Sequence, residues 1–278
     1  MPHPVVTYLA APRAWEFTIA GRQITKYECL VASLKLLGRF APPWPVVVFH
    51  EDLGDADKRE LDAALGREIR HEPVDFSGHE AEHVAGGPYG GRVDTYGYRM
   101  MCRFFCGVMQ AHPALADATH YLRMDDDSYL LDTIPDAAIE RMTSFDYTWL
   151  AGCDDERPDI RDFATGFLAS KGLTVTAPPA PRVPYNNYHT ASLRLWRDPV
   201  VAEFMSLAQD KCLTDCWNDA PVHRELLRQF IPALGYTTHF ETEVMYRHNQ
   251  HCCHKRPHND LCKDGTAGQY QWGPPILT

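Results

Sequence analysis

Short apolar runs alternate with helix-forming segments along the first third of the chain, and this alternation limits the fold more than any other feature. Residues 5–10 and 46–49 are apolar runs that predict buried strands, and residues 69–74 predict a third strand. Residues 24–39 and 55–65, which lie between them, predict helices. This order predicts a mostly parallel sheet with helices on its faces.

The rest of the chain continues the α/β pattern. Helices are expected at 96–112, 199–208 and 220–230, and strands at 121–124, 147–151 and 193–196. Residues 75–95 are rich in glycine, which favours a surface loop over a flap that covers a site. No repeat or low-complexity tract is visible, so we expect a single domain over residues 1–278.

Composition and charge exclude some classes of function. Hydrophobic residues make up 45% of the 278 residues and charged residues 23%, which is typical of a globular domain. The chain has 27 Lys and Arg against 37 Asp and Glu, a formal net charge of −10. A nucleic-acid or anionic-membrane surface needs basic residues, so neither partner is expected. The acidic balance fits a site for a divalent cation.

Three adjacent aspartates follow the strand expected at 121–124. In an extended chain Asp125 and Asp127 point the same way and Asp126 the opposite way. Two neighbouring carboxylates repel each other unless a cation lies between them, and hard oxygen ligands suit Mg²⁺ or Mn²⁺. Ligands of open α/β sheets bind outside the carboxyl ends of the strands. The alternative is a solvated acidic turn, but the apolar flanks favour a metal site.

Four motifs, in chain order, carry a family resemblance. They are Tyr-Arg-Met-Met-Cys-Arg-Phe-Phe at 98–105, Tyr-Leu-Arg-Met-Asp-Asp-Asp at 121–127, Trp-Asn-Asp-Ala-Pro-Val-His at 217–223, and His-Phe followed by Tyr-Arg-His within 239–248. Together they resemble the fungal Golgi α-1,2-mannosyltransferases, glycosyltransferase family fifteen. The string at 217–223, close to the family's Trp-Gly-Asp-Ala-Pro-Val-His, is the most specific of the four.

The resemblance implies the α/β GT-A fold of nucleotide-diphospho-sugar transferases, with a mostly parallel central sheet flanked by helices. It implies one catalytic domain, with a nucleotide-binding half at about 1–132 and a half at about 133–278 that completes the metal and acceptor sites. The implied reaction is a manganese-dependent, retaining transfer of mannose from GDP-mannose to a glycan hydroxyl, with Mg²⁺ as the alternative ion.

The resemblance also implies which residues of this chain bind the metal. Asp125 falls where the family has the Glu of Glu-Pro-Asp, and Asp127 falls on its Asp, so the pair forms an Asp-x-Asp motif. His248 falls on a manganese-binding histidine, and imidazole is a common ligand for such metals. Its alternative is a surface histidine in a His-rich tail. Asp126 is expected beside the nucleotide.

The resemblance likewise implies which residues contact the substrates. Tyr98 and Arg99 fall on a Tyr-Arg pair at the substrate cleft, and Asp219 falls on the aspartate of the motif at 217–223. Tyr98 and Asp219 are expected to position the acceptor hydroxyl. Arg99 is expected to bind phosphate, or else to form an exposed salt bridge. Asp219 is also suited to start a helix.

One departure from the family bears on the mechanism. The family's Asn-Phe-Glu motif, with its candidate nucleophile, aligns with Asn-Tyr-His, so His189 stands in place of the glutamate. Neutral imidazole stabilises a cationic anomeric carbon poorly. Either the acceptor attacks on the face that the diphosphate leaves, or another carboxylate such as Glu241 or Glu243 serves, or the donor sugar differs.

The sequence therefore predicts a hexosyltransferase, and the resemblance implies a mannosyltransferase, that binds a nucleotide sugar and a glycan acceptor. The alternatives are the same fold with another donor such as a UDP-sugar, a catalytically silent carbohydrate-binding relative, and a metal-dependent phosphohydrolase. Each is separable by a donor screen with Mn²⁺.

Location and cysteines complete the expectations. No basic N-terminal region precedes a long apolar run, and no stretch approaches about 18 apolar residues. We expect a soluble protein of the cytoplasm or of a viral factory, or else a Golgi-lumenal domain whose anchor was removed.

Cys252, Cys253 and Cys262 lie among histidines in a spacing unlike standard zinc sites, which favours a disulfide or free thiols.

Overall fold

The computed structural model describes most of the chain. The described residues are 3–12, 16–19, 22–85, 94–150, 152–153, 157–174, 183–184 and 186–248. The glycines at 86–91 and the cysteines at 252–262 lie outside these ranges. Among the described residues, no helix combines the length and the apolar character needed to cross a membrane.

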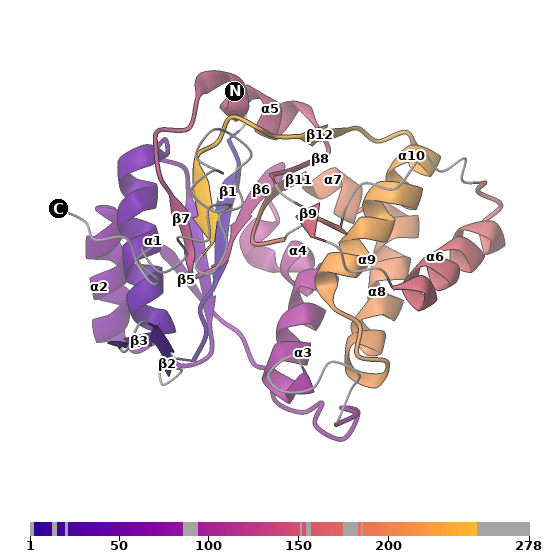
Figure 1. Ribbon diagram of the computed structural model, residues 1–278, viewed down its shortest axis with the longest axis horizontal. Helices are drawn as coiled ribbons and strands as arrows, with labels where there is room; N and C mark the ends of the chain where they lie inside the picture. The colour runs from indigo at the N-terminus through magenta and orange to yellow at the C-terminus, as the bar shows by residue number, and fades with distance from the viewer. Residues whose placement is uncertain are drawn as a thin grey trace.

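A seven-stranded sheet runs through the centre of the molecule (Figure 1). In sheet order its strands are β12 (Thr238–Phe240), β8 (Tyr147–Trp149), β11 (Tyr188–Ser192), β6 (His120–Met124), β1 (Val5–Leu9), β4 (Val46–His50) and β5 (Arg70–Pro73). All neighbours are parallel except β11, which is antiparallel to both β6 and β8. The mostly parallel sheet expected from the sequence is confirmed.

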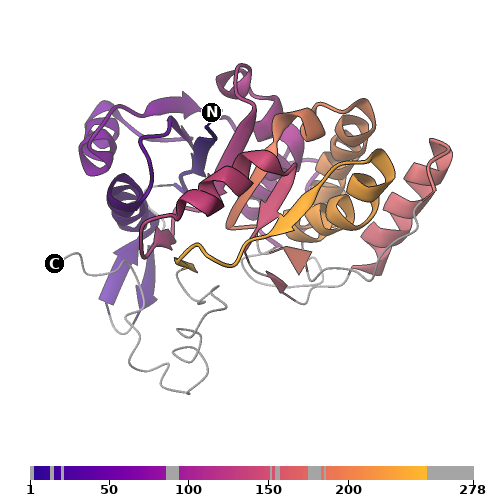
Figure 2. The same ribbon diagram turned by 90° about the horizontal axis from the view of Figure 1, so that it is seen from above.

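Helices cover both faces of the sheet (Figures 1 and 2). On one face lie α1 (Lys26–Phe40), α2 (Asp55–Leu65) and α5 (Asp136–Ser144). On the other lie α3 (Tyr96–Arg103), α4 (Met109–Ala111), α6 (Pro158–Ser170), α7 (Leu193–Trp196), α8 (Pro199–Thr214), α9 (Asp219–Glu225) and α10 (Ile231–Leu234). Side chains of β4 alternate between the two cores, with Val46 and Val48 in the first and Val47 and Phe49 in the second. Both faces of β4 are therefore buried, as its continuous apolar run predicts.

Three two-stranded sheets lie outside the central one. They pair β2 (Glu16–Ile19) with β3 (Arg22–Thr25), β9 (Gly152–Cys153) with β10 (Val183–Pro184), and β7 (Ser128–Leu130) with β13 (Tyr246–His248). The last pair matters for function, because its register sets His248 opposite Ser128, directly after the aspartate triplet. Residues 120 positions apart in the chain thereby become neighbours.

The start of α1 is fixed by a capping box. The Thr25 hydroxyl accepts a hydrogen bond from Glu28 N at 3.0 Å, and the Glu28 carboxylate accepts one from Thr25 N at 2.8 Å. Reciprocal bonds of this kind satisfy two backbone donors that a helix start would leave unpaired. Lys26, the first residue of the helix, is thereby held in one place.

Two sequence expectations for secondary structure are wrong. Residues 193–196 form the short helix α7, whose start is capped by Ser192 Oγ, and the neighbouring strand is β11 at 188–192. The helix expected at 96–112 is interrupted within 104–108, where Cys106 and Gly107 leave helical geometry and Gly107 has φ of 116°. A positive φ is accessible to glycine at little cost, which explains the break at this residue.

Candidate active site

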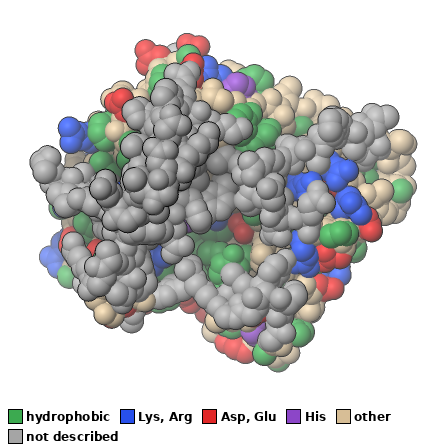
Figure 3. All heavy atoms as spheres, in the orientation of Figure 1, with side chains coloured by type: hydrophobic (Ala, Val, Ile, Leu, Met, Phe, Trp, Pro, Cys, Tyr) green, Lys and Arg blue, Asp and Glu red, His purple; other side chains and the backbone are tan. Residues whose placement is uncertain are grey.

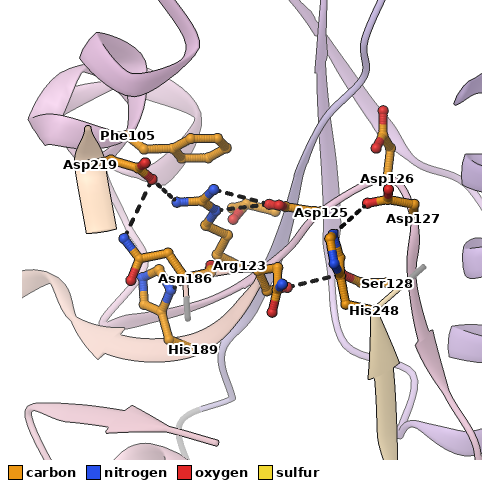
Figure 4. Close-up of polar contacts among 12 residues, drawn as sticks. Phe105, Arg123, Asp125, Asp126, Asp127, Ser128, Asn186, His189, Asp219 and His248 are labelled. Carbon is orange, nitrogen blue, oxygen red and sulfur yellow. Dashed lines mark hydrogen bonds and ion pairs between the residues drawn. The ribbon is translucent and has the colours of Figure 1, made fainter. Parts of the chain in front are cut away.

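The aspartate triplet lies where β6 ends, but not in an extended chain. Ser128 N donates to Asp125 O at 3.0 Å, so the residues form a turn instead of the extended chain expected from the sequence. Asp125 and Asp127 nevertheless meet His248 (Figure 4). One ligand atom of each residue lies within 4.8 Å of the others, and His248 Nε2 is 3.0 Å from Asp127 Oδ1. The three side chains are thus arranged as a metal site would require.

Lys26 supplies a cation on the other side of the triplet. Its Nζ lies 2.9 Å from Asp126 Oδ1 and 2.5 Å from Asp127 Oδ2, and all three side chains are buried. Asp126 Oδ2 also accepts a hydrogen bond from Ala11 N at 3.2 Å. Asp126 therefore contacts Lys26 and the segment after β1, and its carboxylate points away from His248 (Figure 4).

Burial and charge set the protonation of these carboxylates. Burial alone would raise the pKa of Asp127, but His248 and Lys26 outweigh it and hold that pKa well below its usual range. For Asp126, burial raises the pKa, and the neighbouring Asp127 adds to this while Lys26 opposes it. Burial favours the neutral amine of Lys26, yet Asp126 and Asp127 outweigh it and raise the pKa of the ammonium group. Lys26 is consequently a permanent positive charge at the site.

Arg123 is a second buried cation and links the triplet to Asp219. Its Nη2 lies 3.0 Å from Asp125 Oδ1, and its Nη1 donates to Asp219 Oδ2 at 2.6 Å (Figure 4). The guanidinium carbon lies 3.3 Å from the centre of the Phe105 ring, within the range of a cation–π contact. Burial would raise the pKa of Asp219, but Arg123 and His223 together lower it.

A main-chain oxygen holds the surrounding segments together. The carbonyl oxygen of Asn187 lies 3.2 Å from Asp125 N, 3.0 Å from Ser128 Oγ and 3.1 Å from Tyr246 Oη. The donors come from the turn after β6, from β7 and from β13. The loop before β11 thus fixes both the aspartates and the strand that carries His248.

A cavity of about 360 Å³ opens in front of these residues. Its polar wall contains Lys26, Arg123, the aspartate triplet, Asn186, Asn187, Asp219 and His248. Its other walls contain the end of β1 with Ala10 to Pro12, then Glu51 after β4, and Phe76, Tyr98, Met101 and Phe105. The cavity therefore lies at the carboxyl ends of the parallel strands, where ligands of α/β sheets bind.

Tyr98 and Asp219 line this cavity, but Arg99 and His189 do not. Arg99 is completely buried, with Nη1 bonded to Cys216 O and Asn218 Oδ1 and Nη2 paired with Asp94. Its ion pair with Asp94 is buried, so the exposed salt bridge expected as the alternative is wrong. Arg99 instead fixes the start of α9, the helix that begins with Asp219.

His189 is also completely buried, one layer below the cavity. Its Nδ1 lies 3.1 Å from Asn186 O, which can only accept, so Nδ1 carries the proton and Nε2 accepts from Tyr121 Oη at 3.1 Å. The ring stacks on Tyr147 with centres 5.0 Å apart. Burial lowers the pKa of His189 well below its usual value, and His223 and Arg123 lower it further. The imidazole is neutral and supports Asn186 from below.

Glu241 and Glu243 do not reach the cavity. Arg141 on α5 binds both, with Nε 2.8 Å from Glu241 Oε2 and Nη2 2.6 Å from Glu243 Oε2. Neither residue lines the pocket, so among the described residues they are not placed to act on a bound sugar.

Two site residues were missed by sequence reasoning. Arg123 gave a usable signal, since a charged residue within an apolar strand must find a buried partner. Lys26 gave none, because its partners Asp126 and Asp127 are about a hundred residues away in the chain. On the molecular face of Figure 3, basic and acidic side chains lie next to each other over the region of α6.

Comparisons with known proteins identify the fold. No family model and no curated protein sequence matches the chain. Core-mannan synthase A from Aspergillus fumigatus, solved in a Mn/GDP form, is similar in structure, with a TM-score of 0.69 and 17% identity over 92% of this chain and 77% of that one. The mannosyltransferase Ktr4p from S. cerevisiae, solved with GDP, gives a TM-score of 0.69 and 14% identity over 100% of this chain and 76% of that one.

A galactosyltransferase, LgtC, solved with donor and acceptor sugar analogues, is similar at a TM-score of 0.51 and 12% identity over 86% of this chain and 73% of that one. The chain therefore has the GT-A fold of glycosyltransferases, as the sequence predicted. Its structural neighbours include mannosyltransferases at low sequence identity.

Proposed function

We propose that the protein is a metal-dependent glycosyltransferase that transfers mannose from GDP-mannose to a glycan hydroxyl with retention of configuration. The observation that carries the proposal is the convergence of Asp125, Asp127 and His248 at the wall of a cavity in a GT-A fold. The Mn/GDP and GDP forms of the two mannosyltransferases that resemble this chain support the choice of ion and nucleotide.

The residues present fit a divalent ion of this kind. Two carboxylates and one imidazole are a ligand set that suits Mn²⁺, with Mg²⁺ as the alternative. Four carboxylates, those of the triplet and Asp219, face two cations, Lys26 and Arg123, so the cluster carries a formal charge of −2 with all six groups ionised. A divalent cation would neutralise that charge.

The residues of the site would have separate roles in this reaction. Asp125, Asp127 and His248 would hold the ion, which when bound neutralises negative charge on the leaving diphosphate. Arg123 holds Asp125 in place through one edge of its guanidinium group and Asp219 through another. Tyr98 and Asp219 line the same cavity and would orient the acceptor hydroxyl, since fixed orientation supplies much of an enzyme's rate.

The placement of His189 bears on the stereochemical route. A buried, neutral imidazole below the cavity wall is badly placed to attack an anomeric carbon. This supports attack by the acceptor on the face from which the diphosphate departs. Asn186, which His189 supports from below, is a wall residue of the cavity.

A donor screen tests the proposal. The protein is incubated with Mn²⁺, a mannoside acceptor and each nucleotide sugar in turn, and the acceptor is weighed by mass spectrometry. We expect a hexose to be added from GDP-mannose, with retained configuration by NMR, and no addition by the Asp127→Asn variant. Addition only from a UDP-sugar would overturn the donor assignment. Release of phosphate from nucleotides without sugar transfer would point to a phosphohydrolase and overturn the whole proposal.

A further inference from the structure

Lys26 is a residue of the site that has no counterpart in the motifs discussed above. It is the first residue of α1, is held there by the capping box of Thr25 and Glu28, and is only 7% exposed. Its ammonium group contacts two of the three aspartates at 2.9 and 2.5 Å. A flexible side chain whose ammonium group is strongly hydrated in water is buried here against carboxylates. Its positive charge therefore acts directly on these carboxylates.

The contacts of Lys26 divide the triplet into two kinds of carboxylate. Asp126 gives Oδ1 to Lys26 and Oδ2 to Ala11 N, so both of its oxygens are engaged away from His248. Asp127 gives Oδ2 to Lys26 and keeps Oδ1 toward His248. Lys26 thereby compensates the charge of Asp126 and leaves Asp125 and Asp127 to face the position of an ion.

We infer that Lys26 sets the formal charge of the metal site so that it matches a divalent ion. The inference rests on the proposed function, because it concerns the same ion. With all groups ionised the cluster carries −2 when Lys26 is present and −3 when it is absent. Coulomb energy grows with the product of the charges, so the extra negative charge favours a trivalent ion more than a divalent one.

The test compares Mn²⁺ with Tb³⁺ on the full chain. Mn²⁺ affinity is read from the electron paramagnetic resonance signal of the free ion, and Tb³⁺ affinity from its luminescence. In Lys26→Met and Lys26→Gln the ratio of Tb³⁺ affinity to Mn²⁺ affinity is expected to rise by about tenfold or more. Lys35→Met makes the same change at an exposed position of the same helix and should leave the ratio unchanged.

A charge-balanced double variant separates charge from shape. Lys26→Met combined with Asp126→Asn removes one positive and one negative group, so the formal charge returns to −2 and the ratio should return toward that of the wild type. It also leaves no unpaired Asp126 carboxylate, so it is the variant best suited to fold, which circular dichroism checks for every protein tested.

Three results would overturn the inference. They are an unchanged ratio in the folded single variants, loss of both ions in those variants, or a double variant whose ratio stays as high as theirs. Wild-type protein that binds no Mn²⁺ would overturn the proposed function together with the inference. Wild-type protein that binds Mn²⁺ while the variants keep its ratio would overturn the inference alone.

Discussion

Arg123 shows how much of the site depends on single buried contacts. It binds Asp125 and Asp219 and lies on the Phe105 ring, with only 2% of its surface exposed. A buried cation of this kind is stabilised by its partners, and a partner left alone is costly because its charge stays away from water.

We therefore predict strong coupling between Arg123 and Asp219. Arg123→Met should lower the free energy of unfolding by about 3–5 kcal/mol, since it leaves Asp219 buried and unpaired. Asp219→Asn should relieve part of that loss, so the double variant should be more stable than the sum of the single effects by roughly 1–3 kcal/mol. Urea unfolding of the four proteins measures this, and strictly additive effects would contradict it.

His223 makes a pH-dependent contribution to stability. Its Nε2 lies 3.1 Å from Phe105 O and its Nδ1 2.9 Å from Tyr147 Oη, so the neutral ring is fully satisfied. Burial lowers the pKa of His223 from 6.5 to about 4. The unfolded chain therefore takes up a proton below pH 6.5 that the folded chain refuses until about pH 4.

The direction in which pH changes the stability follows from this difference in pKa between the unfolded and the folded chain. Stability that is present above pH 6.5 is lost as the pH falls toward about 4. In His223→Gln, which keeps a donor and an acceptor, the slope of stability against pH in this window should fall by up to about 1.4 kcal/mol per pH unit. Denaturant unfolding at several pH values measures the slope, and a slope equal to that of the wild type would refute the assignment.

At this scale the sequence predicted some positions well and others badly. The sequence predicts Asp125, Asp127 and His248 as one set, and the structure brings them together. Neighbouring helix residues point about 100° apart, so the sequence did not decide whether Tyr98 or Arg99 faced the cavity. The sequence does not predict Lys26 as a site residue, because its contacts arise only when α1 packs beside the end of β6.

Among the elements, α1 and α2 approach each other closely at Gly38. A Cβ atom built there would lie 2.5 Å from the carbonyl oxygen of Leu65, at the end of α2. That oxygen is part of the main chain and cannot rotate away. The close approach matters for function, since α1 is the helix that carries Lys26.

Gly38→Ala should therefore destabilise the protein, although alanine is the better helix former. We expect a loss of about 1–3 kcal/mol from forcing the two helices apart. Gly166→Ala on α6 is the matched control, because no atom lies within 4 Å of its Cβ position. It should gain about 0.5–1 kcal/mol. Unfolding by urea distinguishes the two, and a shift of the same sign in both variants would contradict the packing account.

The sequence predicted elements best where periodicity was strong. The apolar runs at 5–10 and 46–49 are β1 and β4, and the helix expected at 24–39 is α1. The segment 188–192 gives no strand signal because Tyr-His-Thr-Ala-Ser lacks an aliphatic run, and the apolar residues just after it, which form α7, predict the strand instead. Its burial depends on strands on both sides, which local sequence does not record.

On the scale of the whole molecule, the sheet crosses the boundary expected near residue 132. Strands β11, β8 and β12 from the second half extend the sheet that β5, β4, β1 and β6 begin. The site combines both halves in the same way, since Asp125 and Asp127 come from the first and His248 and Asp219 from the second. A ligand of this site should therefore stabilise the entire fold.

Heat protection tests that expectation. A ligand present at a hundredfold excess over its Kd stabilises a protein by about 2.7 kcal/mol. GDP with Mn²⁺ should accordingly raise the Tm by roughly 5 °C, whereas UDP with Mn²⁺ or GDP with a chelator should not. Asp127→Asn should fold but lose the shift. Equal protection by GDP and UDP would count against a guanine nucleotide as the donor.

The oxygen on which the turn after β6, β7 and β13 all converge belongs to the backbone of residue 187. Every amino acid brings that atom, so genetic drift at this position can exchange the side chain and still leave the anchor intact. The hydroxyls of Ser128 and Tyr246, by contrast, belong to side chains and are lost when those residues are replaced by residues without a hydroxyl. A substitution at 187 therefore leaves these three hydrogen bonds possible, whereas loss of the hydroxyl at 128 or at 246 removes one of them.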